Sequence, residues 1–140
     1  MRISARCDYA CKALLELSLH WPNKEPMQIG DIARKQKIPQ RYLTQILIQL
    51  KRLGFVKSLQ GKEGGYNLDR PPESITLGEV MRAIGGPLVP LASSVKQEKS
   101  LFFDIWKEAE QAIARVMDKV TFREICEKYY NKGKAILYQI

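Results

Sequence analysis

Residues 39–68 read PQRYLTQILIQLKRLGFVKSLQGKEGGYNL, and this stretch decides the fold. Its apolar residues recur at the spacing of one helix face, in Leu43, Ile46, Leu47, Leu50 and Leu53. Pro39 suits the first helical position, which needs no amide donor, and Gly54 suits the left-handed residue that follows a helix. The pattern therefore predicts a long helix that begins at Pro39 and ends before Gly54.

The helical spacing stops at Phe55. Residues 55–59 favour a strand, residues 60–65 predict a loop with three glycines, and residues 66–68 favour a returning strand. Upstream, Ile29, Ile32 and Ala33 predict a helix of about two turns over residues 29–35. A short helix, a tight turn, a longer helix and a basic hairpin are the parts of a winged helix-turn-helix, whose second helix enters the major groove of DNA.

Further helices are predicted on both sides of this unit. An apolar stripe predicts a helix from the N-cap residue Ser4 to about His20. Residues 69–74 are expected to be a linker. Thr76 and Glu79 match a capping box, which predicts a short helix from there to about residue 84. In such a box the Thr76 hydroxyl accepts a hydrogen bond from the Glu79 amide, and the Glu79 carboxylate accepts one from the Thr76 amide. Residues 85–100 have no usable periodicity, so we expect a loop there.

A heptad seam follows this loop. Its apolar residues are Phe102, Trp106, Ala109, Ile113, Val116 and Val120. A domain this small has limited interior for a helix of about 20 residues, so we expect the seam to pack against a second copy of the chain. A second capping box at Thr121 opens a last helix toward Tyr130.

Together these elements predict a mainly α fold with a small β hairpin. We expect a winged helix-turn-helix domain over residues 1–76 and a short helix with a connecting loop over 77–100. Residues 101–140 are expected to hold the dimerisation helix and a C-terminal helix.

Composition and charge narrow the function classes. The chain has 140 residues, of which 45% are hydrophobic, and a net charge of +8. Residues 1–70 carry 13 Lys and Arg against 6 Asp and Glu, whereas residues 71–140 carry 10 against 9, so the basic excess lies with the predicted winged helix. A polyanionic partner is therefore expected. No apolar run is long enough to cross a membrane, and three cysteines without a secretion signal predict a cytoplasmic protein without a disulfide scaffold.

Three segments carry a resemblance to a known family: YLTQIL (residues 42–47), LGFVKS (53–58) and GKEGGYNL (61–68). Together they resemble the Rrf2 family of bacterial winged helix-turn-helix transcription regulators. Residues 1–4 (MRIS), 8–10 (DYA) and 75–77 (ITL) fit the same pattern, so the resemblance covers nearly the whole chain.

The resemblance implies a homodimer that binds a palindromic operator in double-stranded DNA, and we expect a repressor. The family's base-contact positions fall on Arg41, Thr44 and Gln45, residue types that suit guanine, thymine and adenine edges. Positions expected to contact the DNA backbone or to lie on the wing are Arg2, Ser4, Arg6, Tyr42, Lys51, Lys57, Gln60 and Lys62. Two positions depart from the family pattern, since many members have Glu at Thr44 and often Arg at Gln60.

Several members of the family hold an iron–sulfur cluster through three cysteines around the loop before the dimer helix. Residues 85–104 of this chain contain no Cys or His, so we expect no cluster and no other cofactor. Asp8 matches a position that some members use as a ligand, but one carboxylate cannot hold a cluster. A thiol, a small molecule or a protein partner remains as the source of a regulatory signal.

Cys7 and Cys11 are four residues apart on the first predicted helix, close enough for two ligands of one metal. Tetrahedral zinc would need two more ligands, whereas Cys126 is remote in sequence and His20 is more than two turns beyond Cys11. We interpret the thiols as buried packing groups, with metal or redox sensing as the alternative.

Two other function classes compete with DNA binding. A winged helix can serve only as a protein-interaction module, which would show no salt-dependent affinity for DNA. Catalysis requires a poised nucleophile or an acid–base pair, and neither a Ser-His-Asp nor a Cys-His set can be assembled around His20, the single histidine. We therefore expect a DNA-binding regulator that is not an enzyme.

Overall fold

The fold is given by a computed structural model that describes residues 2–62 and 64–139. The elements in chain order are α1 (Ala5–His20), α2 (Ile29–Gln36), α3 (Gln40–Arg52), β1 (Val56–Leu59), β2 (Gly65–Leu68), a 3-10 helix (Pro72–Ser74), α4 (Leu77–Gly85), α5 (Ser93–Glu98), α6 (Leu101–Met117) and α7 (Phe122–Gln139). The predicted class, mainly α with a small β hairpin, is confirmed.

Local signals in the sequence place the first helices. The Ser4 hydroxyl accepts a hydrogen bond from the Cys7 amide at 3.1 Å and caps α1 as predicted. Pro39 is the N-cap of α3 and not its first residue, because its ψ of 125° is not helical. Gly54 has a φ of +85°, so it is the predicted left-handed residue after this helix.

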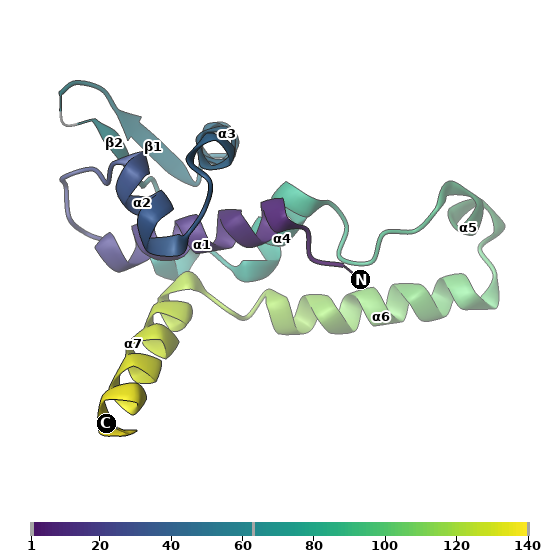
Figure 1. Ribbon diagram of the computed structural model, residues 1–140. Coiled ribbons are helices and arrows are strands. Elements are labelled where there is room, and N and C mark those ends of the chain that lie inside the picture. Colours follow the sequence, from purple (N-terminus) through teal and green to yellow (C-terminus); the bar gives the residue numbers. More distant parts are fainter. Residues whose placement is uncertain (1, 63, 140) are drawn as a thin grey trace.

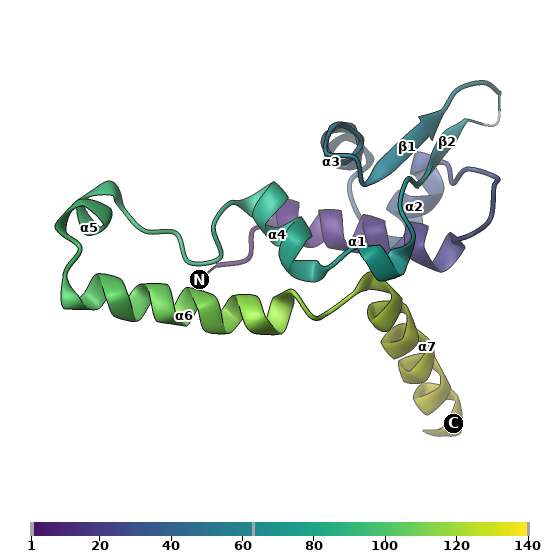
Figure 2. The same cartoon turned by 180° about the vertical axis from the view of Figure 1, so that it is seen from behind.

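Helix α1 is the centre of the core, since α2, α3, α4 and α7 all pack against it. The apolar faces of α1 and α3 are fully buried in this core, as are Ile75 and Phe122. In both views α3 and the hairpin lie on one side of α1, while α7 leaves on the other and α6 extends away (Figures 1 and 2). The first turn of α7 is therefore anchored in the winged-helix unit through Phe122. The domain boundaries expected at residues 76 and 100 stay predictions.

The hairpin is joined to the segment before α2 by a close backbone approach. Strands β1 and β2 pair antiparallel, with Val56 opposite Leu68 and Leu59 opposite Gly65. Tyr66 and Met27 exchange two backbone hydrogen bonds of 2.8 and 2.9 Å, which form an isolated antiparallel bridge between the Met27 segment and β2. A Cβ atom at Gly65 would lie only 2.2 Å from the Met27 carbonyl oxygen. Glycine at this position is thus a packing requirement.

The structure adds detail to three sequence predictions about residues 69–139, of which the continuous loop was wrong. Residues 85–100 are not a continuous loop, because they contain α5, which buries none of its residues and so leaves no apolar pattern. The linker over 69–74 contains the 3-10 helix. The last helix, expected to run toward Tyr130, extends to Gln139.

Helix α6 is also shorter than the predicted seam. It ends at Met117, so Val120 lies beyond the helix. The Val120 carbonyl instead accepts a 2.8 Å hydrogen bond from the Leu77 amide, and Asp118 accepts one of 2.6 Å from Arg82. These contacts with α4 turn the chain away from the helix axis.

The Thr76 cap is only half of the predicted capping box. The Thr76 hydroxyl accepts from the Glu79 amide at 3.2 Å, as predicted. The Glu79 carboxylate, however, accepts from the Arg70 guanidinium at 2.7 Å. Arg70 also lies 5.4 Å from the centre of the Phe55 ring, so this contact connects the linker to both the wing and α4.

The approach of Gly65 to Met27 gives a prediction for stability. The Gly65→Ala substitution forces the wing away from the Met27 segment, so we expect the free energy of unfolding to fall by about 1–3 kcal/mol, the usual cost of overpacking. Urea unfolding followed by circular dichroism measures this change.

Gly133→Ala is the matched control, because no atom lies within 4 Å of the Cβ position at Gly133 in α7. Alanine in an exposed helix is favoured over glycine, so this variant should gain up to about 1 kcal/mol. Equal losses in the two variants would contradict the close approach at Gly65.

Candidate nucleic-acid interface

Helix α3 has one buried and one exposed face. Leu43, Ile46, Leu47 and Leu50 are buried in the core, whereas Arg41 and Gln45 are exposed and Thr44 is half-buried. The three side chains expected to contact bases thus emerge from the first turns of a helix whose other face is fixed by packing.

Two of these residues make contacts within α3. The Arg41 guanidinium lies 5.1 Å from the centre of the exposed Tyr42 ring and donates to its hydroxyl at 3.3 Å. The Thr44 hydroxyl donates to the Gln40 carbonyl at 3.0 Å. Its proton is therefore engaged, which leaves the methyl group and an oxygen lone pair for an outside partner.

The N-terminal segment meets the far end of α3. Arg6 donates through Nε to Gln49 Oε1 at 3.0 Å, so its guanidinium lies beside the recognition helix. The Ser4 hydroxyl is engaged as the cap of α1, and Arg2 is exposed. The structure thus brings these expected backbone contacts to the start of α1, next to the C-terminal half of α3.

The wing is joined to the C-terminal end of α3 and shares a recess with its first residue. The Lys51 ammonium donates to the Ser58 hydroxyl at 2.7 Å and ties the helix to β1. Lys57, Gln60 and Lys62 are exposed on the strand and at the tip of the hairpin. A polar recess between α2, α3 and the hairpin is lined by Gln28, Gly30, Gln40, Gln60, Lys62 and Tyr66. The start of the recognition helix and the wing tip therefore share one face of the molecule.

Two residues of this face were missed by the sequence reasoning. Gln49 is the partner of Arg6, and Ser58 is the partner of Lys51. Gln49 lies four residues after Gln45, so a helical wheel already places it near the outward face. Ser58 lies two residues after the buried Val56, on the same face of β1, and this position gives no signal for its partner, because that partner comes from the preceding helix.

The predicted dimer seam lies on a helix that buries none of its own residues. Phe102 and Trp106 are 62% and 41% exposed, and their rings stack with centres 6.3 Å apart. Ala109 and Val116 are exposed as well. Ile113 differs, because it packs against Cys7, Met81 and Leu88 of its own chain. The seam is therefore exposed along most of its length and anchored near its C-terminal end.

Comparison with known proteins identifies the family to which this architecture belongs. A family model named Rrf2, described as an iron-dependent transcriptional regulator, matches residues 3–128. The chain belongs to the Rrf2 family. Its relatives are regulators of transcription, so the Rrf2 chain is a DNA-binding regulator and not an enzyme. Among its described residues, no helix is both long and apolar enough to span a membrane.

Individual relatives agree with this assignment. The HTH-type transcriptional regulator CymR of Bacillus subtilis is 27% identical over 140 residues, which is 100% of both chains. The solved structure of CymR, titled the global cysteine regulator of B. subtilis, has a TM-score of 0.75 and covers 91% of this chain and 98% of its own. The IscR structure from T. potens also has a TM-score of 0.75, at 28% identity, and covers 92% of this chain and 88% of its own.

The family description implies iron, and the donor atoms of this Rrf2 chain do not fit an iron–sulfur cluster. Residues 85–104 offer no Cys or His. Within residues 2–62 and 64–139, no three or more His, Cys, Asp or Glu side chains are grouped to hold a metal ion. Iron–sulfur clusters are bound by sets of thiolates, with imidazole in some types.

Proposed function

We propose that this protein represses transcription by binding a palindromic operator as a homodimer, with α3 in the major groove and the hairpin against the flanking backbone. The observation that carries this proposal is the exposed pair Arg41 and Gln45 on a helix fixed by its buried face. A regulator of this kind acts in the cytoplasm, where bacterial DNA lies, and we propose that it needs no iron–sulfur cluster.

The base contacts follow from side-chain chemistry. Arg41 suits guanine, because a guanidinium donates two hydrogen bonds to its O6 and N7 atoms, and Gln45 suits adenine, which presents one donor and one acceptor. Thr44 already donates to the Gln40 carbonyl, so its methyl group can contact a thymine methyl. Such contacts give a sequence preference, since each good bidentate pair discriminates by about 1–3 kcal/mol.

The backbone contacts supply affinity. The exposed cations Arg2, Lys57 and Lys62 are proposed to contact phosphates directly, together with the Tyr42 hydroxyl and the Gln60 amide. Arg6 and Lys51 are held by Gln49 and Ser58, so they present their charge from fixed positions. Ser4 caps α1, and we propose that it contributes to phosphate binding at the N-terminus of this helix.

The homodimer is proposed from the exposed seam on α6. Phe102, Ala109 and Val116 would leave water on pairing, and exposed apolar patches of this kind mark interaction surfaces. A symmetric dimer places two recognition helices at two half-sites, which explains a palindromic operator.

The DNA contacts give a prediction for binding. Binding to a library of genomic fragments, measured at two salt concentrations, should show a sequence preference and a steep loss of affinity with salt. Arg41→Ala and Gln45→Ala should each lose about 1–3 kcal/mol of discrimination at one base position. Lys57→Ala should weaken binding to all fragments and reduce the salt slope by about 1.

The matched control is Arg123→Ala, since Arg123 is an exposed cation on α7. This variant should keep both affinity and preference. An equal, weak affinity of the wild-type protein for every fragment would refute the proposal and favour a module that binds only proteins.

The seam gives a prediction for the oligomeric state. Trp106→Asp places a charge in the proposed interface, so sedimentation should show a shift from dimer to monomer at micromolar concentration, while circular dichroism stays unchanged. Tyr130→Asp on α7 is the control, because Tyr130 is 54% exposed and lies outside the seam. A wild-type protein that sediments as a monomer would exclude the homodimer.

A further inference from the structure

Sulfur-bearing side chains from three helices meet where the winged-helix unit joins α6. Cys7 and Met81 are buried in one cluster with Leu88, and Cys11 and Met117 pack against it. Cys7 and Cys11 lie one turn apart on the same face of α1, so their thiols are neighbours in this cluster. The fold thus brings two thioethers, from α4 and from the end of α6, to a pair of thiols that alone supplies only two ligands for a metal ion.

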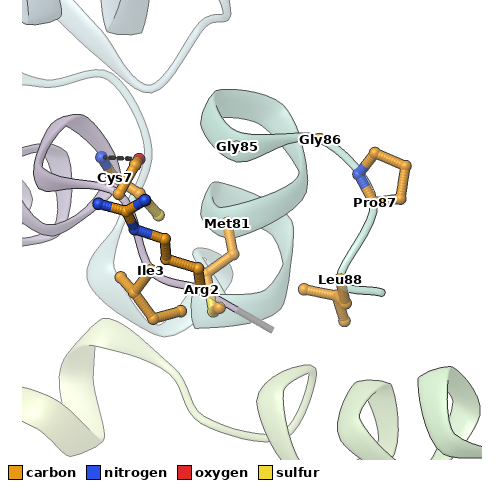
Figure 3. Close-up of a pocket in the computed structure, with 9 residues that line it drawn as sticks. Arg2, Ile3, Cys7, Met81, Gly85, Gly86, Pro87 and Leu88 are labelled. Carbon is orange, nitrogen blue, oxygen red and sulfur yellow. Dashed lines mark hydrogen bonds between the residues drawn. The ribbon is translucent and has the colours of Figure 1, made fainter. Parts of the chain in front are cut away.

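A small cavity reaches this cluster. Its volume is about 80 Å³, and its lining includes Arg2, Cys7 and Met81. In Figure 3 these side chains come from the N-terminal segment, α1 and α4, and the turn Gly85–Leu88 closes the opposite side. The volume exceeds the roughly 10–15 Å³ needed to admit one water-sized probe, so a single ion has room beside Cys7 and Met81. Cys11 does not line the cavity and lies one turn further along α1, against the same cluster.

We propose that this cluster binds one Cu(I) ion through the Sγ atoms of Cys7 and Cys11 and the Sδ atom of Met81, with Met117 at the rim. Thiolate and thioether ligands are soft and select Cu(I), whereas Ca²⁺ and Mg²⁺ require oxygen ligands. Zn²⁺ prefers four thiolate, imidazole or carboxylate ligands, and this cluster offers only two thiols.

Proton release accompanies binding. Burial raises the pKa of Cys11 to about 12 and also raises the pKa of Cys7, so both enter as neutral thiols at neutral pH. Two S–H bonds break, two Cu–S bonds form, two protons go to solvent, and copper stays Cu(I). The thiolate complex carries one negative charge, which the nearby Arg2 guanidinium offsets. Apparent affinity should therefore rise with pH below the thiol pKa values, by up to about a hundredfold per pH unit.

The site would connect three helices. Its ligands come from α1 and α4, and Met117 and Ile113 of α6 pack on the same cluster. Bound Cu(I) would therefore fix α6 against the winged-helix unit and raise the unfolding temperature of the native state. The proposal does not depend on DNA binding, and its test does not use DNA.

The test is an anaerobic titration of the full-length protein with Cu(I), in competition with the chromophoric chelator bicinchoninate. We expect one Cu(I) per chain, a sulfur-only first shell by X-ray absorption, and a higher unfolding temperature. Cys7→Ser/Cys11→Ser should abolish stoichiometric binding, and Met81→Leu should weaken it at least about tenfold. Cys126→Ser is the matched control, because Cys126 is a buried thiol outside this cluster, and it should bind as the wild type does.

The single variant Cys11→Ser separates loss of copper binding from misfolding. Cys11 is only partly buried, and circular dichroism can verify that this variant is folded. It should lose most of its Cu(I) affinity while it stays folded. Equal Cu(I) uptake by the folded Cys11→Ser variant, nitrogen or oxygen ligands in the first shell, or tighter binding of Zn²⁺ than of Cu(I) would each overturn the proposal.

Discussion

The packing of one face of α3 against the core fixes the direction of every side chain on its other face. Four Leu and Ile side chains of α3 are fully buried, and each stabilises the native state by about 1.5–3 kcal/mol relative to exposure. Rotating the helix would expose several of them at once. The packing of this face therefore also holds Arg41 and Gln45 outward. This constraint turns an amphipathic helix into a rigid reading surface, which is what base recognition requires.

The surfaces proposed for DNA recognition and for pairing occupy different parts of the molecule. Helix α3 and the hairpin lie on one side of α1, while α6 extends away from the unit and carries exposed aromatic residues (Figure 1). In our account the two are coupled mechanically, because α6 contacts the unit through Ile113 and Met117 on the cluster that contains Cys7 and Met81. A change at that junction would alter the spacing of the two recognition helices without touching the DNA-binding surface.

The sequence predicted the winged helix well, because Leu43, Leu47 and Leu50 repeat at helical spacing and the Gly-rich hairpin has few alternative folds. It missed α5, which buries no residue and therefore has no apolar period. It assigned the Glu79 carboxylate to a local cap, whereas Arg70 provides a charged partner that only the folded linker brings near. The surroundings of Cys7 were equally invisible, since Met81 and Met117 reach it only through tertiary packing.

Hydroxyl-radical footprinting of a bound operator fragment tests the central claim most directly, because it reports where the two recognition surfaces touch one duplex. The account predicts two protected patches related by a dyad, with centres separated by about one helical turn or a multiple of it, roughly 10 base pairs per turn. A single protected patch, or uniform protection along the fragment, would contradict it.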